Sequence, residues 1–295
     1  MKANLLLTGS TGFIGRYLLE TLEESYKDKY NIILLSTEKK YNHLTILHKN
    51  YSFTKEDFIN ENITNIDIVL HAGAFTPKSN HEANNVEKSL SNITHTLHLI
   101  KNLPNIPQKF IFLSTLDVYG NVKEVINETT STLPLTMYGF SKLYCEKMLE
   151  KLADNYNFIL QILRIGHIYG KGEEAYKKLI PVVINKLKNN ENIEIVGTGY
   201  EKRSFLHVKD AVKVIIKSID LEKYVGPINI CSNRAYTVQE IIEILINISG
   251  KEVNIKHTNT DYRGIDYVFD TSKMNNILGN ETIDIYEGLK DEFYG

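Results

Sequence analysis

The feature that most limits how this 295-residue chain can fold lies near its first residues. An apolar run at 5–7 leads directly into a glycine-rich segment, 8–15, and then into a stretch with apolar residues at helical spacing. We therefore predict a strand, a tight turn and a helix. Glycines let the turn approach a pyrophosphate closely, and the start of the helix directs its amide groups at the anion. The predicted dinucleotide-binding residues are Gly9, Thr11, Gly12, Phe13, Ile14 and Gly15.

The glycine spacing is Gly-x-x-Gly-x-x-Gly, which differs from the commonest dinucleotide fingerprint, Gly-x-Gly-x-x-Gly. An ordinary turn between strand and helix is the alternative interpretation. Three glycines placed between a strand and a helix favour the binding function.

Short apolar runs and amphipathic stretches alternate along the first half of the chain. We predict buried strands at 32–35, 66–70, 110–113 and 158–163. Helices are predicted at 12–26, 86–101 and 138–156. This alternation is typical of an α/β fold with a parallel, doubly wound sheet. Beyond residue 166 the pattern becomes mixed, with helices predicted at 176–188, 208–219 and 237–248 and a strand at 193–196.

Tyr138 and Lys142 lie four residues apart on one of these predicted helices and therefore share a face. A nearby ammonium favours phenolate, so we expect Lys142 to lower the pKa of Tyr138 toward the range useful for proton transfer. With 18 tyrosines in the chain, a chance pair on an exposed helix is the competing interpretation.

Composition limits the remaining possibilities. A net charge of −2 gives no electrostatic reason to expect nucleic acid or an anionic membrane as a partner. Two cysteines, Cys145 and Cys231, are too few for a disulfide framework and fit a reducing, cytoplasmic compartment. We see no secretion signal, no apolar run long enough to span a membrane and no cluster predicted to bind a metal.

The order of these motifs resembles the extended short-chain dehydrogenase/reductases of the nucleotide-sugar epimerase/dehydratase family. The resemblance covers nearly the whole chain. Its motifs are the glycine segment 8–15, then 71–74, Asn92, 113–120, Tyr138 with Lys142, 163–164, 167–170, 203–210 and 263–264. It implies a Rossmann-like domain at 1–165 and a smaller, mixed, mainly substrate-binding domain at 166–295. Segments around 200–220 are expected to pack back on the first domain.

The resemblance also implies the catalytic residues. Thr115, with Ser114 beside it, follows a predicted central strand and would hydrogen-bond the reacting sugar oxygen. Tyr138 would act as general acid or base on that oxygen. Lys142 would hold the phenolate and bind the nicotinamide ribose. In isolation, a Ser-Thr pair after a strand is more often a simple turn.

The cofactor site is implied to include Tyr138, Lys142 and the backbone of Ala72, Gly73 and Ala74. Asn92 would lie near the lysine, although a surface asparagine is an equal alternative. Related NAD enzymes usually carry an acid at the end of strand two, where this chain has Ser36 and Thr37 followed by two lysines. This favours NADP over NAD, and Glu38 could still bind the ribose hydroxyls.

Three residues are implied to bind the substrate besides Thr115. Arg203 and Arg263 are candidates for its diphosphate, because a guanidinium binds two phosphate oxygens at once. Both could instead be ordinary surface arginines. His167 stands where the family usually has a substrate-contacting asparagine, which leaves the sugar open.

Two reactions remain open. Dehydratases of this family need an adjacent Asp-Glu pair after the threonine, where this chain has Leu116 and Asp117. We therefore favour NADPH-dependent reduction of an NDP-4-keto-6-deoxy sugar, with an NAD-dependent 4-epimerase as the close alternative. A non-catalytic dinucleotide-binding protein is less favoured, because such proteins commonly lose the Tyr or the Lys. The resemblance further implies a homodimer and a role in polysaccharide precursor synthesis.

Overall fold

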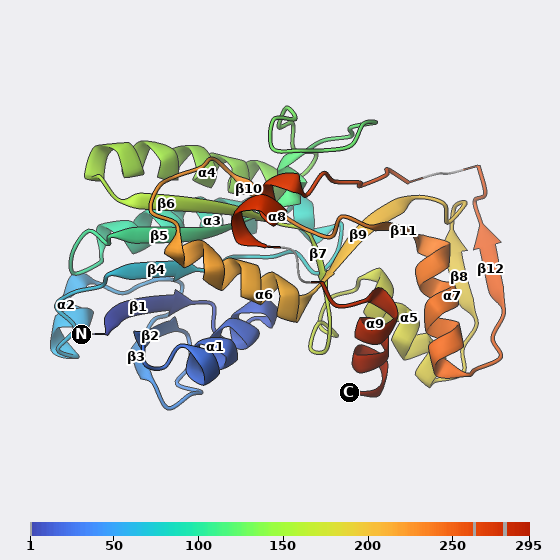
Figure 1. Cartoon of the computed structure of the whole chain (residues 1–295), viewed down its shortest axis with the longest axis horizontal. Helices are drawn as coiled ribbons and strands as arrows, with labels where there is room; N and C mark the ends of the chain where they lie inside the picture. The colour runs from blue at the N-terminus through green and yellow to red at the C-terminus, as the bar shows by residue number, and fades with distance from the viewer. Residues whose placement is uncertain (1, 262–263, 280–281) are drawn as a thin grey trace.

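A computed structural model describes residues 2–261, 264–279 and 282–295. Seven parallel strands form its main sheet, in the order β10-β6-β5-β4-β1-β2-β3 (Figure 1). The strands are β1 (Ala3–Thr8), β2 (Tyr30–Ser36), β3 (Leu44–Leu47), β4 (Ile68–His71), β5 (Lys109–Thr115), β6 (Ile159–Ile165) and β10 (Ile228–Ile230). The chain reverses its direction across the sheet between β1 and β4, and ligands of open α/β sheets bind beside such a reversal.

Helices cover both faces of this sheet (Figure 1). On one face α1 (Phe13–Ser25) and α6 (Val208–Lys217) pack over a core that includes Leu7, Leu113 and Ile228. On the other face α3 (Val86–Lys101) and α4 (Met137–Tyr156) cover a second core. The short α2 (Lys55–Asn60) follows β3, and α8 (Ser272–Leu278) lies near β10. The predicted α/β class with a doubly wound parallel sheet is confirmed.

The ends of the helices follow from local chemistry. The Thr136 hydroxyl accepts a hydrogen bond from the Gly139 N–H and starts α4, while Asn157 ends it in the left-handed conformation. Asn85 caps α3 in the same way by accepting from the Lys88 N–H at 2.8 Å. These caps fix where the face carrying Tyr138 and Lys142 begins.

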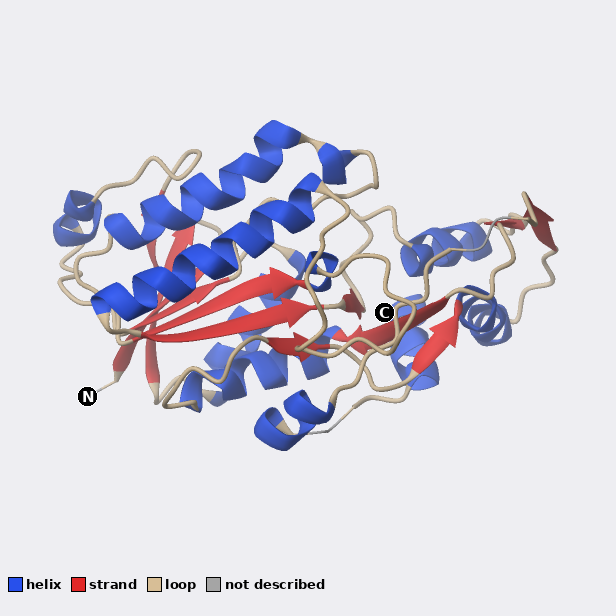
Figure 2. Cartoon of the chain, turned by 90° about the horizontal axis from the view of Figure 1, so that it is seen from above, coloured by secondary structure: helices blue, strands red, loops and turns tan. Residues whose placement is uncertain are grey.

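The second part of the molecule extends away from the carboxyl ends of the main strands (Figure 2). It holds a three-stranded sheet of β7 (His167–Tyr169), β9 (Lys202–His207) and β11 (Ala235–Thr237). A two-stranded sheet joins β8 (Ile193–Val196) and β12 (Ile255–Thr258). Three helices pack around a shared apolar core: α5 (Leu179–Lys188), α7 (Val238–Ser249) and α9 (Ile285–Tyr294).

The helix predicted at 176–188 begins later than expected. Lys178 has an extended backbone, with ψ 171°, and serves as the N-cap, so α5 starts at Leu179. The preceding residues form a loop whose polar contacts are with α1 and the β4–α3 loop instead of a helical ladder. Three-residue strands such as β7 and β11 were not predicted, because an alternating pattern cannot be recognised over so few residues. Within the described residues, none of the helices has the length and apolarity needed to cross a membrane.

Candidate active site

The glycine turn at the carboxyl end of β1 is packed too tightly to accept side chains. Gly9 has φ +74°, and a Cβ there would lie 2.6 Å from the Gly73 nitrogen. A Cβ on Gly15 would overlap the Gly9 carbonyl oxygen. The Gly12 N–H donates to that same oxygen at 2.9 Å. At Gly9 and Gly15 the turn therefore presents backbone alone beside the start of α1, as a pyrophosphate cradle requires.

The end of β4 supports this turn. The Thr8 hydroxyl accepts from the Gly73 N–H at 2.8 Å and pairs with His71 Nδ1 at 2.8 Å. The His71 Nε2 pairs with the Thr96 hydroxyl at 3.1 Å. Burial lowers the pKa of His71 to about 3, so the ring is neutral and serves as a hydrogen-bonding spacer. Ala72 and Gly73 are half-buried and Ala74 is exposed, beside the glycine turn.

Three of the predicted catalytic side chains come together at the end of β5. Thr115 is the last residue of β5, and its hydroxyl interacts with the hydroxyl of Tyr138 from the first turn of α4. The Thr76 hydroxyl reaches the same phenol. Lys142 follows one turn later on α4 and is 3% exposed, with its Nζ 4.2 Å from the centre of the Phe112 ring.

The expected effect of Lys142 on Tyr138 is not what this structure shows. Burial raises the pKa of Tyr138, and the nearby Asp117 carboxylate raises it further. The hydrogen bonds from Thr115 and Thr76 only partly oppose that rise. The sequence-based expectation of a lowered pKa was therefore wrong for the protein without ligands, because the phenol is desolvated while the ammonium faces Phe112. The phenol is protonated at neutral pH.

Lys142 itself is tuned by its surroundings. Burial lowers its pKa to about 8, against smaller opposing contributions from Cys145 and Glu146. The ammonium form still dominates at neutral pH, and a modest change in its environment would release the proton.

Ser114 points away from this group and into a buried polar network. Its hydroxyl donates to Glu146 Oε1 at 2.5 Å. Arg164 on β6 binds the same carboxylate through Nε at 3.0 Å and Nη2 at 2.7 Å. Arg164 Nη1 donates to the Tyr119 hydroxyl, which donates to Asn229. The network fixes β5, β6, β10 and α4 relative to one another.

Asn92 is buried and connects the two sides of the predicted nicotinamide region. Its Oδ1 accepts from the Phe75 N–H at 2.8 Å, in the loop after β4. Its Nδ2 donates to the Ser141 hydroxyl at 3.1 Å, next to Lys142 on α4. The predicted surface alternative for Asn92 is excluded by its 2% exposure.

The end of β2 lies where the sequence places the adenosine ribose. Ser36 is buried, and its hydroxyl accepts from the Glu38 N–H at 3.3 Å. Thr37 and the following side chains at 38–40 are exposed. Hydroxyl groups with two nearby lysines thus stand at the strand end that carries an acid in many NAD enzymes.

The substrate-binding candidates lie on the small sheet. The His167 ring on β7 lies 5.9 Å from the rings of Phe205 and Tyr267. Burial and the charge of Arg203 lower the pKa of His167 to about 3, so this ring is neutral. Arg203 on β9 donates to the carbonyls of Lys202 and Ile265 and lies over the Tyr267 ring. Arg263 lies outside the described residues.

Besides Thr76, sequence reasoning missed the role in the site of three further side chains near the same group. Asp117 is open to solvent, but the surrounding protein raises the pKa of its carboxyl, and Lys178 opposes that rise. The charge of Lys178 also lowers the pKa of His167, and Tyr176 contributes to the raised pKa of Tyr138. Asp117 could have been found from its place two residues after Thr115. The other two belong to a loop with no recognisable motif.

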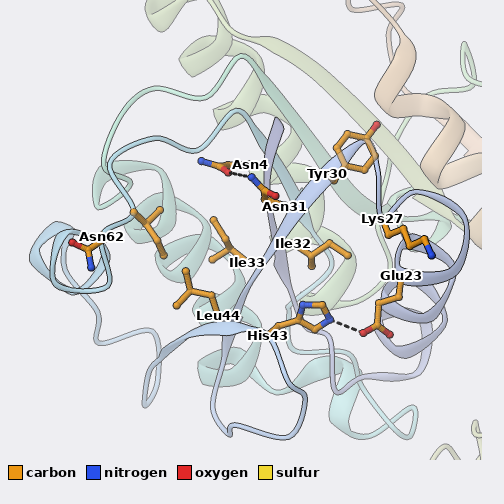
Figure 3. A pocket seen from close by; sticks show the side chains of 11 residues that line it. Asn4, Glu23, Lys27, Tyr30, Asn31, Ile32, Ile33, His43, Leu44 and Asn62 are labelled. Atoms are coloured by element: carbon orange, nitrogen blue, oxygen red, sulfur yellow. Dashed lines mark hydrogen bonds and ion pairs between the residues drawn. The ribbon is translucent and has the colours of Figure 1, made fainter. Parts of the chain in front are cut away.

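A groove of about 470 Å³ lies elsewhere, at the amino ends of β1, β2 and β3 (Figure 3). Its polar side chains pair with each other, Glu23 with His43 at 2.6 Å and Asn4 with Asn31 at 3.1 Å. The predicted site residues lie at the opposite, carboxyl ends of the strands, where open α/β sheets bind ligands. The carboxyl edge is therefore the candidate active site.

Comparisons with known proteins identify related sequences. Residues 5–231 match the family model "NAD dependent epimerase/dehydratase family". The dTDP-D-glucose 4,6-dehydratase of Dictyostelium discoideum is 29% identical over 83% of this chain and 62% of its own length. The dTDP-4-dehydro-6-deoxyglucose reductase of Escherichia coli is 28% identical over 83% of this chain and 81% of its own length.

Solved structures show the same fold at lower identity. The UDP-glucuronic acid 4-epimerase of Bacillus cereus, in complex with UDP-glucuronic acid and NAD, superposes with a TM-score of 0.85. The two chains are 22% identical, with 99% of this chain and 98% of that chain covered. The UDP-glucose 4-epimerase of Thermotoga maritima gives 0.85 at 23% identity, covering 99% and 97%.

Proposed function

The chain belongs to the NAD dependent epimerase/dehydratase family and is an enzyme of the extended short-chain dehydrogenase/reductase type. We propose that it transfers a hydride at C4 of a nucleotide-activated hexose. The best-supported reaction is NADPH-dependent reduction of an NDP-4-keto-6-deoxy sugar. The observation that carries the proposal is the placement of buried Thr115 at the end of β5 beside α4, which carries buried Tyr138 in its first turn and buried Lys142 one turn later.

The residues at the carboxyl edge fit a dinucleotide. Gly9 and Gly15 leave no room for side chains, so the backbone can approach a pyrophosphate at the start of α1. Ser36 and Thr37 would meet the adenosine ribose, and Lys39 and Lys40 could pair with a 2′-phosphate, which supports NADP. When bound, the nicotinamide supplies or accepts the hydride.

The chain's own residues would handle the proton. A ketone accepts a proton on its oxygen as it is reduced, so the catalytic phenol must begin protonated. Burial and Asp117 raise the pKa of Tyr138 and keep it in that form. Thr115 would hydrogen-bond the same oxygen as charge develops on it. Lys142 would stabilise the phenolate that remains.

A dehydration reaction is less well supported. Eliminating water across C5 and C6 needs an acid beside the base, and Leu116 occupies that position. Leu116 is 4% exposed and packs in an apolar cluster with Val118 and Phe269. Its side chain has no proton to give.

The second candidate is an NAD-dependent 4-epimerase. It needs the same Thr115, Tyr138 and Lys142, and the family's solved relatives include 4-epimerases, one of them in complex with NAD. In that reaction the keto-sugar would be turned over in the site before the hydride returns.

The cofactor that co-purifies with the protein, released by denaturation and identified by mass spectrometry, separates the candidates. An empty site that takes up NADPH in preference to NADH, followed by NADPH oxidation on 4-keto-6-deoxy sugar nucleotides, is the expected result. Stoichiometric bound NAD, with interconversion of C4 epimers, would replace the reductase by the epimerase. A protein that binds a dinucleotide and turns over no nucleotide sugar would contradict both.

We further propose a homodimer formed through α3 and α4. Apolar side chains stand exposed on these two helices: Val86, Leu90, Phe140 and Tyr144. Light scattering after gel filtration should give twice the chain mass of 33.8 kDa, and Phe140→Lys with Tyr144→Lys should reduce it to one. A monomeric wild type would contradict this proposal.

A further inference from the structure

The loop of residues 170–178, between β7 and α5, spans the junction of the two parts of the molecule (Figure 1). The Lys177 N–H donates to the Lys78 carbonyl at 3.2 Å, in the loop after β4. At the start of the loop, the Gly170 N–H faces α9 and partly opposes the rise that burial causes in the pKa of Glu292. The loop is therefore held by an element from each part.

The first turn of α1 makes the most specific contact with this loop. Arg16 Nη2 donates to the Gly172 carbonyl at 3.0 Å, and the neighbouring Tyr17 hydroxyl donates to the Lys171 carbonyl at 2.9 Å. Gly172 has φ +100°, and a Cβ there would overlap the Arg16 guanidinium. A side chain at residue 172 would both strain the backbone and displace Arg16.

The far end of the loop faces the active site. The Tyr176 ring lies 6.5 Å from the ring of Phe13, the first residue of α1. Tyr176 also contributes to the raised pKa of Tyr138. The charge of Lys178 lowers the pKa of both Asp117 and His167. One short loop thus joins the helix that starts at the glycine turn to the side chains around the reacting position.

We propose that Arg16 is a positioning residue that clamps the 170–178 loop to the first turn of α1, so that dinucleotide binding at the glycine turn orders the substrate-facing end of the loop. This proposal rests on the dinucleotide-binding function proposed above. A ligand that orders the turn from Gly12 to Gly15 also fixes the base of the Arg16 side chain. Ordering one site then lowers the entropy cost of organising the other, and this is a coupling free energy between them.

Limited tryptic digestion measures the clamp directly, because Lys171, Lys177 and Lys178 are exposed within the loop. We expect cleavage after these three residues to be about tenfold faster in Arg16→Met than in wild type, as loss of a hydrogen bond from a charged donor implies. Arg234→Met is the control for charge, since it also removes one arginine, and the Arg234 guanidinium lies over the Tyr236 ring, away from the loop. Equal cleavage in wild type and Arg16→Met would overturn the clamp.

Added NADP⁺ or NAD⁺ tests the coupling, with binding followed in parallel by calorimetry. We expect the dinucleotide to slow loop cleavage in wild type and in Arg234→Met, and to protect Arg16→Met far less at equal occupancy. A wild type that binds dinucleotide without gaining protection would overturn the coupling alone. A wild type that binds neither dinucleotide would overturn the proposed function and the coupling with it.

Gly172→Ala tests the same contact by changing the loop residue that Arg16 binds. Its added methyl should expel the guanidinium and speed cleavage of the loop. If both substitutions act by breaking the clamp, Arg16→Met combined with Gly172→Ala should be cleaved no faster than Gly172→Ala alone. Multiplying effects of the two substitutions would contradict the proposal.

Discussion

The two walls of the active site are built in different ways. On the main-sheet wall, Glu146 is fully buried and accepts hydrogen bonds from Ser114 and Arg164. On the opposite wall, the two cations Lys178 and Arg203 stand partly in solvent. The Lys178 side chain is 43% exposed, and Arg203 is half-buried with two of its hydrogen bonds on backbone carbonyls.

This difference separates two tasks. A buried network in which Glu146 is paired with both Ser114 and Arg164 holds the adjoining strand and helix, and with them Thr115, Tyr138 and Lys142, in one arrangement, as proton transfer requires. Partly exposed cations on a small sheet can adjust to a ligand with little change in folding free energy. The main-sheet wall therefore suits the chemistry common to a family, and the opposite wall suits the choice of substrate.

The contrast between the two walls would fail most clearly if the phenol of Tyr138 could be removed without loss of hydride transfer. Tyr138→Phe keeps the ring and its packing but removes the proton. We expect single-turnover hydride transfer to fall by about 10²–10⁴-fold, the usual contribution of a general acid. Dinucleotide affinity, measured by calorimetry, should stay near that of wild type. Unchanged turnover would show that another group protonates the sugar.

The rigidity of the main-sheet wall can be tested at Glu146. Glu146→Ala leaves the Arg164 guanidinium buried without its carboxylate, and the free energy of unfolding should fall by about 3–5 kcal/mol. Urea denaturation followed by circular dichroism measures this change. Lys147→Ala, which breaks the exposed pair with Glu150, is the control and should cost less than about 1 kcal/mol. Equal losses in the two variants would remove the contrast between the walls.

Arg203 tests the adaptable wall. If Arg203 binds the substrate diphosphate as proposed, Arg203→Met should raise the KM for the nucleotide sugar by about 30-fold, roughly 2 kcal/mol, because a charged hydrogen-bonding group is lost. The maximal rate should change by less than about threefold. Arg234→Met provides a control with the same change of charge. A large fall in kcat at unchanged KM would place Arg203 in the chemistry instead.

A smaller effect is expected from pH. Burial raises the pKa of Glu173 to about 7 and that of Glu292 to about 8, both near Lys178 and Glu174. At pH values between 4.5, the pKa of these acids in the unfolded chain, and the raised folded values, the folded protein binds more protons than the unfolded chain. The free energy of unfolding therefore falls as the pH rises from about 5 to about 8.

Glu292→Gln isolates that contribution, because the amide imitates the protonated acid at every pH. Thermal denaturation should find the variant and wild type alike at pH 5, and the variant more stable by about 1–2 kcal/mol at pH 8. Asp291→Asn, an exposed neighbour, should show no such trend. A constant difference across the pH range would place the loss of stability elsewhere.

The contrast between the walls also explains what the sequence could predict. The main strands and helices repeat long apolar patterns, so α3 and β8 were predicted at their observed bounds, 86–101 and 193–196. The glycine turn and the face shared by Tyr138 and Lys142 follow from local geometry and needed no tertiary information.

Properties that depend on distant neighbours were harder to predict. The direction of the Tyr138 pKa shift is set by burial and by Asp117, and neither can be evaluated from helix spacing alone. The orientation of Ser114 toward Glu146 depends on Arg164 from the next strand. Lys178 lies on the loop that Arg16 contacts at Gly172, and no local sequence pattern encodes that contact.

The place of β10 at one edge of the main sheet has a consequence for synthesis on the ribosome. The chain builds β1 to β6, leaves to form β7, β8 and β9, and returns with α6 and β10. Until α6 emerges, the sheet face bearing Leu113 and Leu163 lacks part of its cover. At translation rates of about 5–20 residues per second, the roughly fifty residues between β6 and the end of α6 take several seconds. During that interval the nascent chain is a natural client for chaperones.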